Sequence, residues 1–322
     1  MDRTPHITQH VHHPELRTDS TLHVVGVVSN PVRYHSRYRL AREWMEAMRE
    51  TPHVSLHIVE AAYGDRHHEV ATSAPEDLRV RTKSEVWCKE NLINLGVRHT
   101  LPRDWKYVAW VDADVTFRDS GWALETIHQL QHWPVIQPWQ QCADLGHLGG
   151  ITQTFASFGL LNQRGVRQQT HPAEPYQYGH SGFAWAATRA FWEQTGGLMD
   201  FAILGSADHH MAWAMAGSVD SSIHKGMRPS FFRRCHEWQA RATRITHGNV
   251  GFAPGRIEHS FHGSKKKRAY RERWQMLIEH GFDPDRDLVT DDQGLVQLAG
   301  KPALEQAIRL YNRARNEDGI DE

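Results

Sequence analysis

The stretch YVAWVDADV, residues 107–115, is the part of the chain that decides its fold. Its first five residues are apolar, and two aspartates one residue apart, Asp112 and Asp114, follow directly. A short apolar run is typical of a buried strand in a parallel sheet, and such sheets bind ligands at the carboxyl ends of their strands. Two carboxylates at that edge can hold a divalent cation. The stretch therefore predicts an α/β fold with a metal site at the end of this strand.

The residues before this stretch supply the rest of an α/β alternation. Apolar runs at 22–28 and 54–60 predict two more strands. Helical patterns at 38–49 and 83–95 separate these strands from each other and from 107–111. Right-handed crossovers place such strands in one sheet. We therefore expect a Rossmann-like, mainly parallel central sheet flanked by helices.

Three parts of the chain are expected to differ in structure. Residues 1–20 are polar and unpatterned, which predicts a flexible N-terminal arm. Residues 21–263 are expected to form the main α/β domain. Residues 264–322 are expected to form a C-terminal helical extension that packs against it, with helices at 268–279 and 301–315.

Composition and charge exclude several classes of protein. No apolar run approaches the roughly 18 residues that span a bilayer, and the N-terminus lacks a signal peptide's apolar core, which predicts a cytoplasmic protein without a membrane partner. The three widely spaced cysteines indicate neither a disulfide framework nor a zinc site built on cysteine. Basic residues gather at 225–244 and 265–273. Each cluster could bind phosphate groups of a nucleotide or nucleic acid, or could simply form a charged surface exposed to solvent.

The Asp-x-Asp triplet alone is a weak sign of a metal site. Residues 283–287 contain the same spacing twice, beside a proline in a polar stretch. Asp112 and Asp114 differ because they end a hydrophobic strand late in an α/β unit. That position favours a metal site over a turn at a strand end.

With this placement, the stretch resembles the nucleotide-sugar-dependent glycosyltransferases of the GT-A fold. In that family the first aspartate faces the ribose of the nucleotide, and the last binds the Mn²⁺ or Mg²⁺ that bridges the sugar diphosphate. The resemblance implies that Asp112 and Asp114 form the metal site, with Asp112 also contacting the donor. It further implies a nucleotide-sugar donor, most commonly a UDP-sugar, and makes residues 21–263 a GT-A catalytic domain.

Further motifs follow the order seen in GT-A enzymes. A glycine-containing loop at 180–183 and a Gly-Gly turn at 196–197 precede Asp208, which opens a predicted helix. In inverting members the acid at this place removes the proton of the acceptor hydroxyl, and the resemblance implies that catalytic role for Asp208. The family often has Glu-Asp where this chain has Ala207 before Asp208. An ordinary helix N-cap is the alternative, and inversion or retention is open.

The stretch EHSFHGSK, residues 258–265, is similar to the His-x-Gly-x-x-Lys motif that closes several GT-A families, although its spacing is tighter. In those families the histidine is a third protein ligand of the metal, and the lysine contacts the diphosphate. The resemblance implies His262 as the metal ligand, with His259 as the alternative. It implies Lys265 as a donor-binding residue.

Polar and cationic residues after the first strand and near the second helix are candidates for binding the donor nucleotide, since a cationic side chain there could pair with a phosphate. They are Ser29, Asn30, Arg33, Arg37, Arg81 and Lys89. The alternative is that residues such as Arg37 and Lys89 only cover a solvated helix face.

The span 22–322 also resembles a phage-type glycosyltransferase group related to the enzymes that accompany TET/JBP-type base hydroxylases. The stretches that carry this likeness are 105–114, 125–132, 204–211 and 315–318. It implies transfer of a sugar to the hydroxyl of 5-hydroxymethylcytosine in DNA, in the host cytoplasm if the chain is phage-encoded.

Two other functions stay open. The first is a glycosyltransferase that acts on a glycan, a lipid-linked sugar or a protein. The second is a non-catalytic nucleic-acid-binding module, against which the retained Asp112, Asp114, Asp208 and His262 speak. The oligomeric state is also open.

Overall fold

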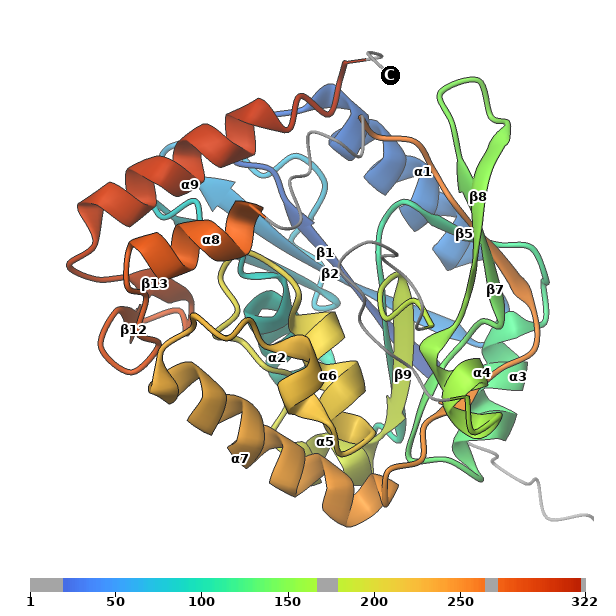
Figure 1. The fold of residues 1–322 in the computed structure, drawn as a ribbon. Helices are drawn as coiled ribbons and strands as arrows, with labels where there is room; N and C mark the ends of the chain where they lie inside the picture. The colour runs from blue at the N-terminus through green and yellow to red at the C-terminus, as the bar shows by residue number, and fades with distance from the viewer. Residues whose placement is uncertain (1–19, 167–178, 264–271, 320–322) are drawn as a thin grey trace, which may run out of the picture.

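The computed structural model describes residues 20–166, 179–263 and 272–319. Its centre is a seven-stranded sheet with the order β10-β6-β9-β4-β1-β2-β3 (Figure 1). Strand β9 runs antiparallel to β4 and β6, and the other neighbouring pairs are parallel. The mainly parallel sheet expected from the sequence is therefore confirmed. Its strands are β1 Leu22–Ser29, β2 Val54–Tyr63, β3 Asp77–Thr82, β4 Tyr107–Val111, β6 Val135–Gln137, β9 Ala184–Thr188 and β10 Gly251–Phe252.

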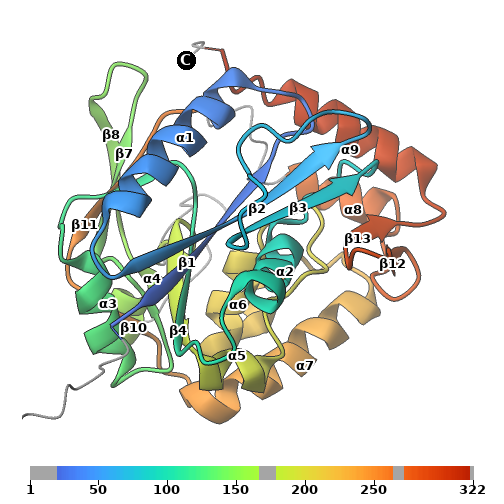
Figure 2. The same cartoon turned by 180° about the vertical axis from the view of Figure 1, so that it is seen from behind.

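Helices cover both faces of this sheet, as Figure 2 shows from behind. Neighbouring residues of β1 point to opposite faces. Val24 belongs to a buried cluster with α1 and α3, and Val25 belongs to one with α2 and α5 to α9. The helices are α1 His35–Glu50, α2 Lys89–Thr100, α3 Trp122–Leu130, α4 Phe158–Gln163, α5 Arg189–Thr195, α6 Ala207–Met215, α7 Pro229–Thr246, α8 Glu272–Glu279 and α9 Pro302–Ala314, with a 3₁₀ turn at Val219–Ser222.

A second sheet brings distant parts of the chain to the end of β4. Its order is β5-β11-β7-β8, formed by β5 Val115–Phe117, β11 Arg256–His259, β7 Gln141–Leu145 and β8 Ile151–Ala156. Strand β5 begins directly after Asp114 and pairs with β11, so that Val115 lies opposite His259. The backbone N–H of Ser260 also donates to the Asp114 carbonyl at 2.8 Å. This pairing fixes β11 beside the aspartate pair.

The C-terminal residues pack onto the α2 side of the central sheet. Leu304 and Ile308 of α9 are fully buried in the same cluster as Val25. A hairpin of β12 Leu288–Thr290 and β13 Val296–Leu298 lies between α8 and α9 in the sequence. The division of the chain at residue 263 stays a prediction.

The predicted elements agree with the structure in type and differ at some ends. The three predicted strands are present, and the predicted helix at 301–315 is α9. The helix expected at 83–95 begins only at Lys89, because the backbone N–H groups of Ser84 and Trp87 bond to Thr82 Oγ1 and to the Ile203 carbonyl.

The edge strand β3 was missed by the sequence analysis. The predicted arm and the start of the predicted helix at 268–279 lie outside the described residues. Within the described parts of the chain, no helix combines the length and the apolar character needed to cross a bilayer.

Candidate metal centre and its pocket

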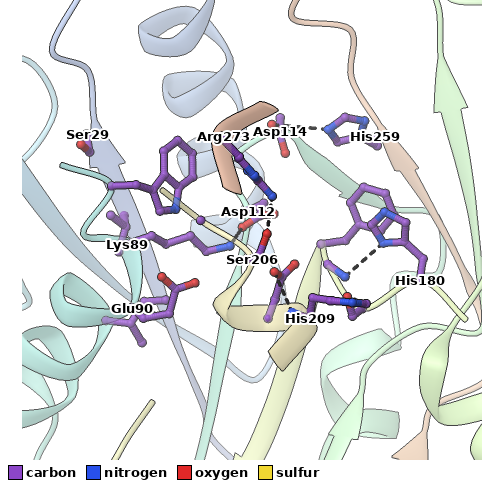
Figure 3. Close-up of a pocket in the computed structure, with 18 of the residues that line it drawn as sticks. Ser29, Lys89, Glu90, Asp112, Asp114, His180, Ser206, His209, His259 and Arg273 are labelled. Atoms are coloured by element: carbon purple, nitrogen blue, oxygen red, sulfur yellow. Dashed lines mark hydrogen bonds and ion pairs between the residues drawn. The ribbon is translucent and has the colours of Figure 1, made fainter. Parts of the chain in front are cut away.

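A pocket of about 1090 Å³ opens at the carboxyl ends of β1 and β4. Residues far apart in the sequence converge there, from the two strand ends, the start of α2, the start of α6 and the end of β11 (Figure 3). Eight of the residues predicted from the sequence line it: Ser29, Arg37, Lys89, Asp112, Asp114, Asp208, His259 and His262. The carboxyl edge of the sheet is where an α/β fold is expected to bind ligands.

Asp114 and two histidines form a compact cluster in this pocket. The Oδ2 atom of Asp114 lies 2.9 Å from Nε2 of His262 and 3.6 Å from Nε2 of His259. The ligand atoms of the three residues all lie within 4.8 Å of one another. The sequence left His259 and His262 as alternatives, and the structure brings both beside Asp114. One carboxylate and two imidazoles are a plausible set of metal ligands.

The electrostatics of Asp114 fit a bound cation. Burial raises the pKa of the Asp114 carboxyl, but the neighbouring His259 and His262 outweigh burial and hold this pKa well below its usual value. Asp114 Oδ1 is buried, and no group of the described chain donates a hydrogen bond to it. A buried acceptor without a partner is costly. A cation at the cluster would satisfy this atom.

Asp144, which the sequence analysis missed, orients His259. In the parallel pairing of β7 with β11, Asp144 lies opposite His259, and its Oδ1 atom accepts a hydrogen bond from His259 Nδ1 at 2.6 Å. Asp144 is 3% exposed. A proton on Nδ1 places the lone pair on Nε2, the nitrogen that faces Asp114 and could bind a metal ion there. An acid directly after the buried Cys142 and Ala143 of β7 is the signal that could have revealed it.

Asp112 contacts a different partner from Asp114. Its carboxylate pairs with the Lys89 ammonium, and it is not part of the cluster of Asp114 with the two histidines (Figure 3). Burial raises the pKa of Asp112. Burial lowers the pKa of Lys89, but Asp112 and then Glu90 outweigh it, so the net shift is upward. Metal binding by Asp112 stays a prediction, as does donor binding by both residues.

Glu90 is a further acid in the pocket that the sequence analysis did not single out. It follows Lys89 on α2 and is buried. Burial raises the pKa of its carboxyl to about 7, against the opposing effect of Lys89. Its place on a predicted helix gave no sign of this burial.

Asp208 also lines the pocket, at the second position of α6. The N-cap of α6 is Ser206, so the N-cap alternative for Asp208 is wrong. Its Oδ1 atom accepts the backbone N–H of His209 at 2.9 Å. A Cβ at Gly182 would lie 3.0 Å from Asp208 Oδ2 and 2.9 Å from His180 Cε1. Gly182 therefore leaves the space that the Asp208 carboxylate occupies.

Two residues of α8 contact the residue that precedes α6. Arg273 Nη2 and Trp274 Nε1 donate to Ser206 Oγ at 2.5 and 3.1 Å, and all three residues line the pocket. Ser206 has a positive φ of 72°, which is uncommon outside glycine. The sequence analysis did not find this contact because it joins residues more than sixty positions apart.

Two of the predicted donor-binding residues have partners at the end of β1. Ser29 Oγ lies 2.7 Å from the Tyr63 hydroxyl. Arg37 donates to the Ser29 carbonyl at 2.6 Å and forms a two-pronged ion pair with Glu317. Both residues line the pocket.

The other predicted donor-binding residues lie elsewhere. Asn30 bonds to the backbone of Tyr34. Arg33 pairs with Glu69 at 3.5 Å, and Arg81 donates to backbone carbonyls. These three are not among the described residues that line the pocket. Lys265 lies outside the described residues.

The predicted basic cluster at 225–244 is partly neutralised. Arg233 and Arg234 both pair with Asp285, and Arg241 donates to the Thr195 carbonyl at 2.8 Å. Lys225 is exposed and lines the pocket. Most of the second cluster, 265–273, lies outside the described residues.

Comparison with protein-family models gives no match, and neither does comparison with curated proteins. Among solved structures, the chain is similar to the catalytic domain of Drosophila beta1,4galactosyltransferase 7 in complex with xylobiose, at 13% identity and a TM-score of 0.39. A mutant of that enzyme in complex with manganese, UDP-Gal and xylobiose gives 12% and 0.38. Both matches cover 88% of this chain and 98% of the other.

A third solved structure is a proposed nucleotide-diphospho-sugar transferase from Desulfovibrio desulfuricans. It is 10% identical with a TM-score of 0.34, and the match covers 91% of this chain and 96% of that one. TM-scores below 0.5 describe a distant likeness.

Proposed function

We propose that this protein is a metal-dependent glycosyltransferase that moves a sugar from a nucleotide-sugar donor to a hydroxyl acceptor. The observation that carries the proposal is the convergence of Asp114, His259 and His262 in one pocket at the carboxyl end of β4. The Lys89–Asp112 pair and Asp208 line the same pocket. Its volume of about 1090 Å³ is at the upper end of typical ligand sites, which suits a donor together with part of an acceptor.

The set of ligands favours Mn²⁺ over Mg²⁺ as the metal. Mg²⁺ prefers oxygen ligands and a complete octahedron, whereas imidazole nitrogens suit first-row transition metals. Asp114, His259 and His262 would hold the ion. When bound, the ion would offset the negative charge that builds on the departing nucleoside diphosphate.

Asp208 is proposed as the catalytic base. Its carboxylate, held beside Gly182, would take the proton of the acceptor hydroxyl as the hydroxyl oxygen bonds to the anomeric carbon. The bond from that carbon to the nucleoside diphosphate breaks on the opposite side, which gives inversion. Lys89 would contact the donor phosphates, and Asp112 the ribose. A UDP-sugar is the proposed donor.

We propose 5-hydroxymethylcytosine in DNA as the acceptor, and the sequence resemblance over 22–322 supports this. The exposed Lys225 and the nearby Arg273 line the pocket and could contact backbone phosphates. Chemistry on a base requires that the nucleotide leave the stack and enter a pocket. A glycan or another hydroxyl acceptor is the alternative outcome of the test.

The test is transfer to defined acceptors. The protein is incubated with Mn²⁺, a panel of nucleotide sugars, and either hydroxymethylated or unmodified DNA, and the DNA is then digested to nucleosides for mass spectrometry. We expect a sugar-sized mass increase on 5-hydroxymethyl-2′-deoxycytidine alone, lost with EDTA and in Asp114→Ala. Mn²⁺-dependent release of nucleoside diphosphate without any modified nucleoside would exclude the DNA acceptor. If the protein turns over none of the donors in the presence of Mn²⁺, the proposed glycosyltransferase function is excluded.

A further inference from the structure

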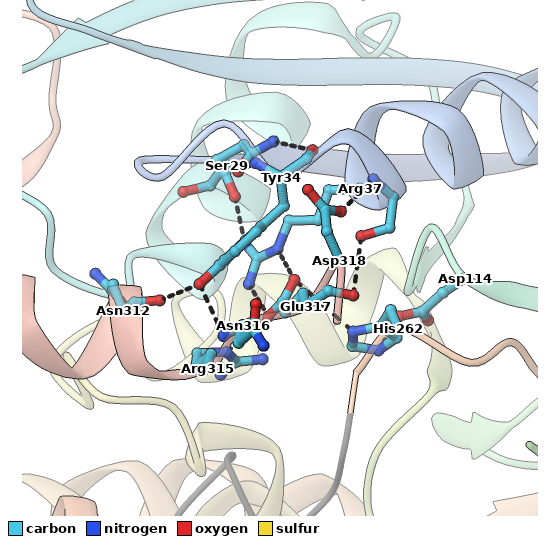
Figure 4. A network of polar contacts seen from close by, with 12 residues as sticks. Ser29, Tyr34, Arg37, Asp114, His262, Asn312, Arg315, Asn316, Glu317 and Asp318 are labelled. Carbon is cyan, nitrogen blue, oxygen red and sulfur yellow. Dashed lines mark hydrogen bonds and ion pairs between the residues drawn. The ribbon is translucent and has the colours of Figure 1, made fainter. Parts of the chain in front are cut away.

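The segment after α9, residues 315–318, turns back to the N-terminal end of α1, and we name it the C-terminal strap (Figure 4). The Asp318 carboxylate accepts the backbone N–H groups of His35 and Ser36 at 2.9 and 2.8 Å. The Tyr34 hydroxyl donates to the Asn312 carbonyl at 2.8 Å and accepts the Asn316 N–H at 2.9 Å. Both ends of the strap are thus fixed to the chain that follows β1.

Glu317 lies at the centre of the strap, and its side chain is 1% exposed. Arg37 holds its carboxylate through two nitrogens, with Nη2 at 2.7 Å from Oε1, and Arg315 Nε donates to the same oxygen at 2.6 Å. Two guanidiniums therefore fix one buried carboxylate in position.

The Glu317 carboxylate also faces the metal cluster. Its Oε2 atom lies 3.8 Å from Nδ1 of His262, on the side of the ring away from Asp114 (Figure 4). The backbone approaches closely too, since a Cβ at Gly263 would lie 2.9 Å from the Glu317 Cα. Gly263 has a positive φ of 84°, which also favours glycine.

The two histidines of the cluster have similar surroundings. Each directs Nε2 toward Asp114 and has a buried carboxylate on its Nδ1 side. Asp144 Oδ1 hydrogen-bonds to His259 Nδ1 at 2.6 Å, and Glu317 Oε2 lies farther from His262 Nδ1, at 3.8 Å. A histidine that binds a metal through Nε2 must carry its proton on Nδ1, and a carboxylate facing Nδ1 favours that form and fixes the ring.

We propose that Glu317 is a positioning residue of the metal centre, which holds His262 with Nε2 directed at the ion. The C-terminal strap is then part of the active site. Glu317 lies 203 positions after Asp114 in the chain, so no local motif reveals its role. This inference rests on the proposed function, because it requires that Asp114, His259 and His262 bind a metal.

The experiment measures Mn²⁺ binding to the full chain without a donor, so that catalysis does not enter the readout. Metal-free protein is titrated with Mn²⁺, and free Mn²⁺ is followed by electron paramagnetic resonance. We expect Glu317→Gln to raise the Mn²⁺ dissociation constant about tenfold, a typical effect of losing a carboxylate behind a ligating histidine. Asp318→Asn is the matched control, since it alters the same strap but its carboxylate bonds to the backbone of His35 and Ser36 and not to the cluster histidines His259 and His262.

Thermal unfolding with EDTA and with Mn²⁺ separates positioning from folding. A variant that is less stable but still binds Mn²⁺ normally keeps the full rise in Tm that Mn²⁺ causes. A variant that no longer positions His262 shows a smaller rise. If Glu317→Gln does not fold, Glu317→Asp replaces it under the same criterion. An unchanged Mn²⁺ affinity, or an equal loss in Asp318→Asn, would overturn the inference and leave the proposed function standing. Absence of Mn²⁺ binding in the wild type would overturn both.

Discussion

The Asp144 carboxylate accepts the Nδ1–H of His259 at 2.6 Å, and the two residues lie opposite each other on neighbouring parallel strands. This contact directs His259 Nε2 to the side of the ring where Asp114 lies. Because both side chains are buried, the orientation of the ring is set before any ligand arrives. Sheet pairing, and not the local sequence around His259, therefore prepares this side of the metal centre.

Asp144→Asn is expected to weaken Mn²⁺ binding about 10-fold to 100-fold, because the amide no longer favours a proton on His259 Nδ1. Mn²⁺ titration of the donor-free protein measures this. Glu258→Gln serves as the control, since Glu258 lies beside His259 on β11 but pairs with Arg118, whose side chain is exposed. An unchanged Mn²⁺ affinity in Asp144→Asn would show that Asp144 does not tune the ligand.

Asp114→Ala is expected to abolish measurable Mn²⁺ binding and Mn²⁺-dependent donor binding, since it removes the only carboxylate of the described cluster. Calorimetric titration with Mn²⁺ and then with a UDP-sugar measures both steps. Asp112→Asn is the comparison: the sequence resemblance makes Asp112 a further metal ligand, whereas its pairing with Lys89 predicts weaker donor binding with Mn²⁺ binding retained. Loss of Mn²⁺ binding in Asp112→Asn would instead make Asp112 a direct ligand.

The sequence predicted those parts of the fold and site that depend on local pattern. The apolar runs of β1 and β4 indicate buried strands, and position at a strand end separated Asp112 and Asp114 from the other acidic triplets. Strand β3 was missed because it is an edge strand in which the apolar Leu78 and Val80 alternate with polar residues, so it has no continuous apolar run.

The partners of the site residues could not be predicted, because they depend on tertiary packing between distant positions. Asp144 and His259 are 115 residues apart, and Arg37 and Glu317 are 280 apart. Arg37 is an example: the sequence predicted that it binds the donor, and no local pattern indicated its ion pair with Glu317.

Asp208→Asn is expected to leave donor affinity within about twofold and to lower transfer by about 10²-fold to 10⁴-fold, the usual contribution of a general base. The amide keeps the shape of the side chain and can still accept the His209 N–H. Calorimetry with Mn²⁺ and donor, followed by single-turnover transfer, measures the two effects. Retained transfer would show that Asp208 is not the base.

Gly182→Ala is expected to impair transfer more than donor binding. The added Cβ would lie 2.9 Å from His180 Cε1 and 3.0 Å from Asp208 Oδ2, so His180 must shift and the carboxylate must give by a few tenths of an ångström. Transfer depends on the exact position of the base, so a small displacement lowers its rate. Gly150→Ala is the control, because a Cβ there meets no atom within 4 Å. Equal transfer rates in both variants would show that the room beside Asp208 is not needed.

His23 and His57 form a buried pair within the central sheet, away from the metal cluster. His23 Nδ1 lies 3.0 Å from His57 Nε2, between the parallel strands β1 and β2. Burial, and then the neighbouring His23, lowers the pKa of His57 to about 4, and burial lowers the pKa of His23 as well. The folded protein therefore keeps this pair neutral at pH values where the unfolded chain takes up protons.

The free energy of unfolding is accordingly expected to fall as the pH decreases from about 6.5 to about 4, because the unfolded state binds more protons in this window. For His57 alone the loss is on the order of 2–3 kcal/mol. Urea unfolding between pH 4.5 and 7.5 tests this, with His57→Gln beside the wild type. The stability advantage of the wild type over His57→Gln should shrink toward low pH. A pH-independent gap for His57→Gln would show that His57 is protonated equally in both states.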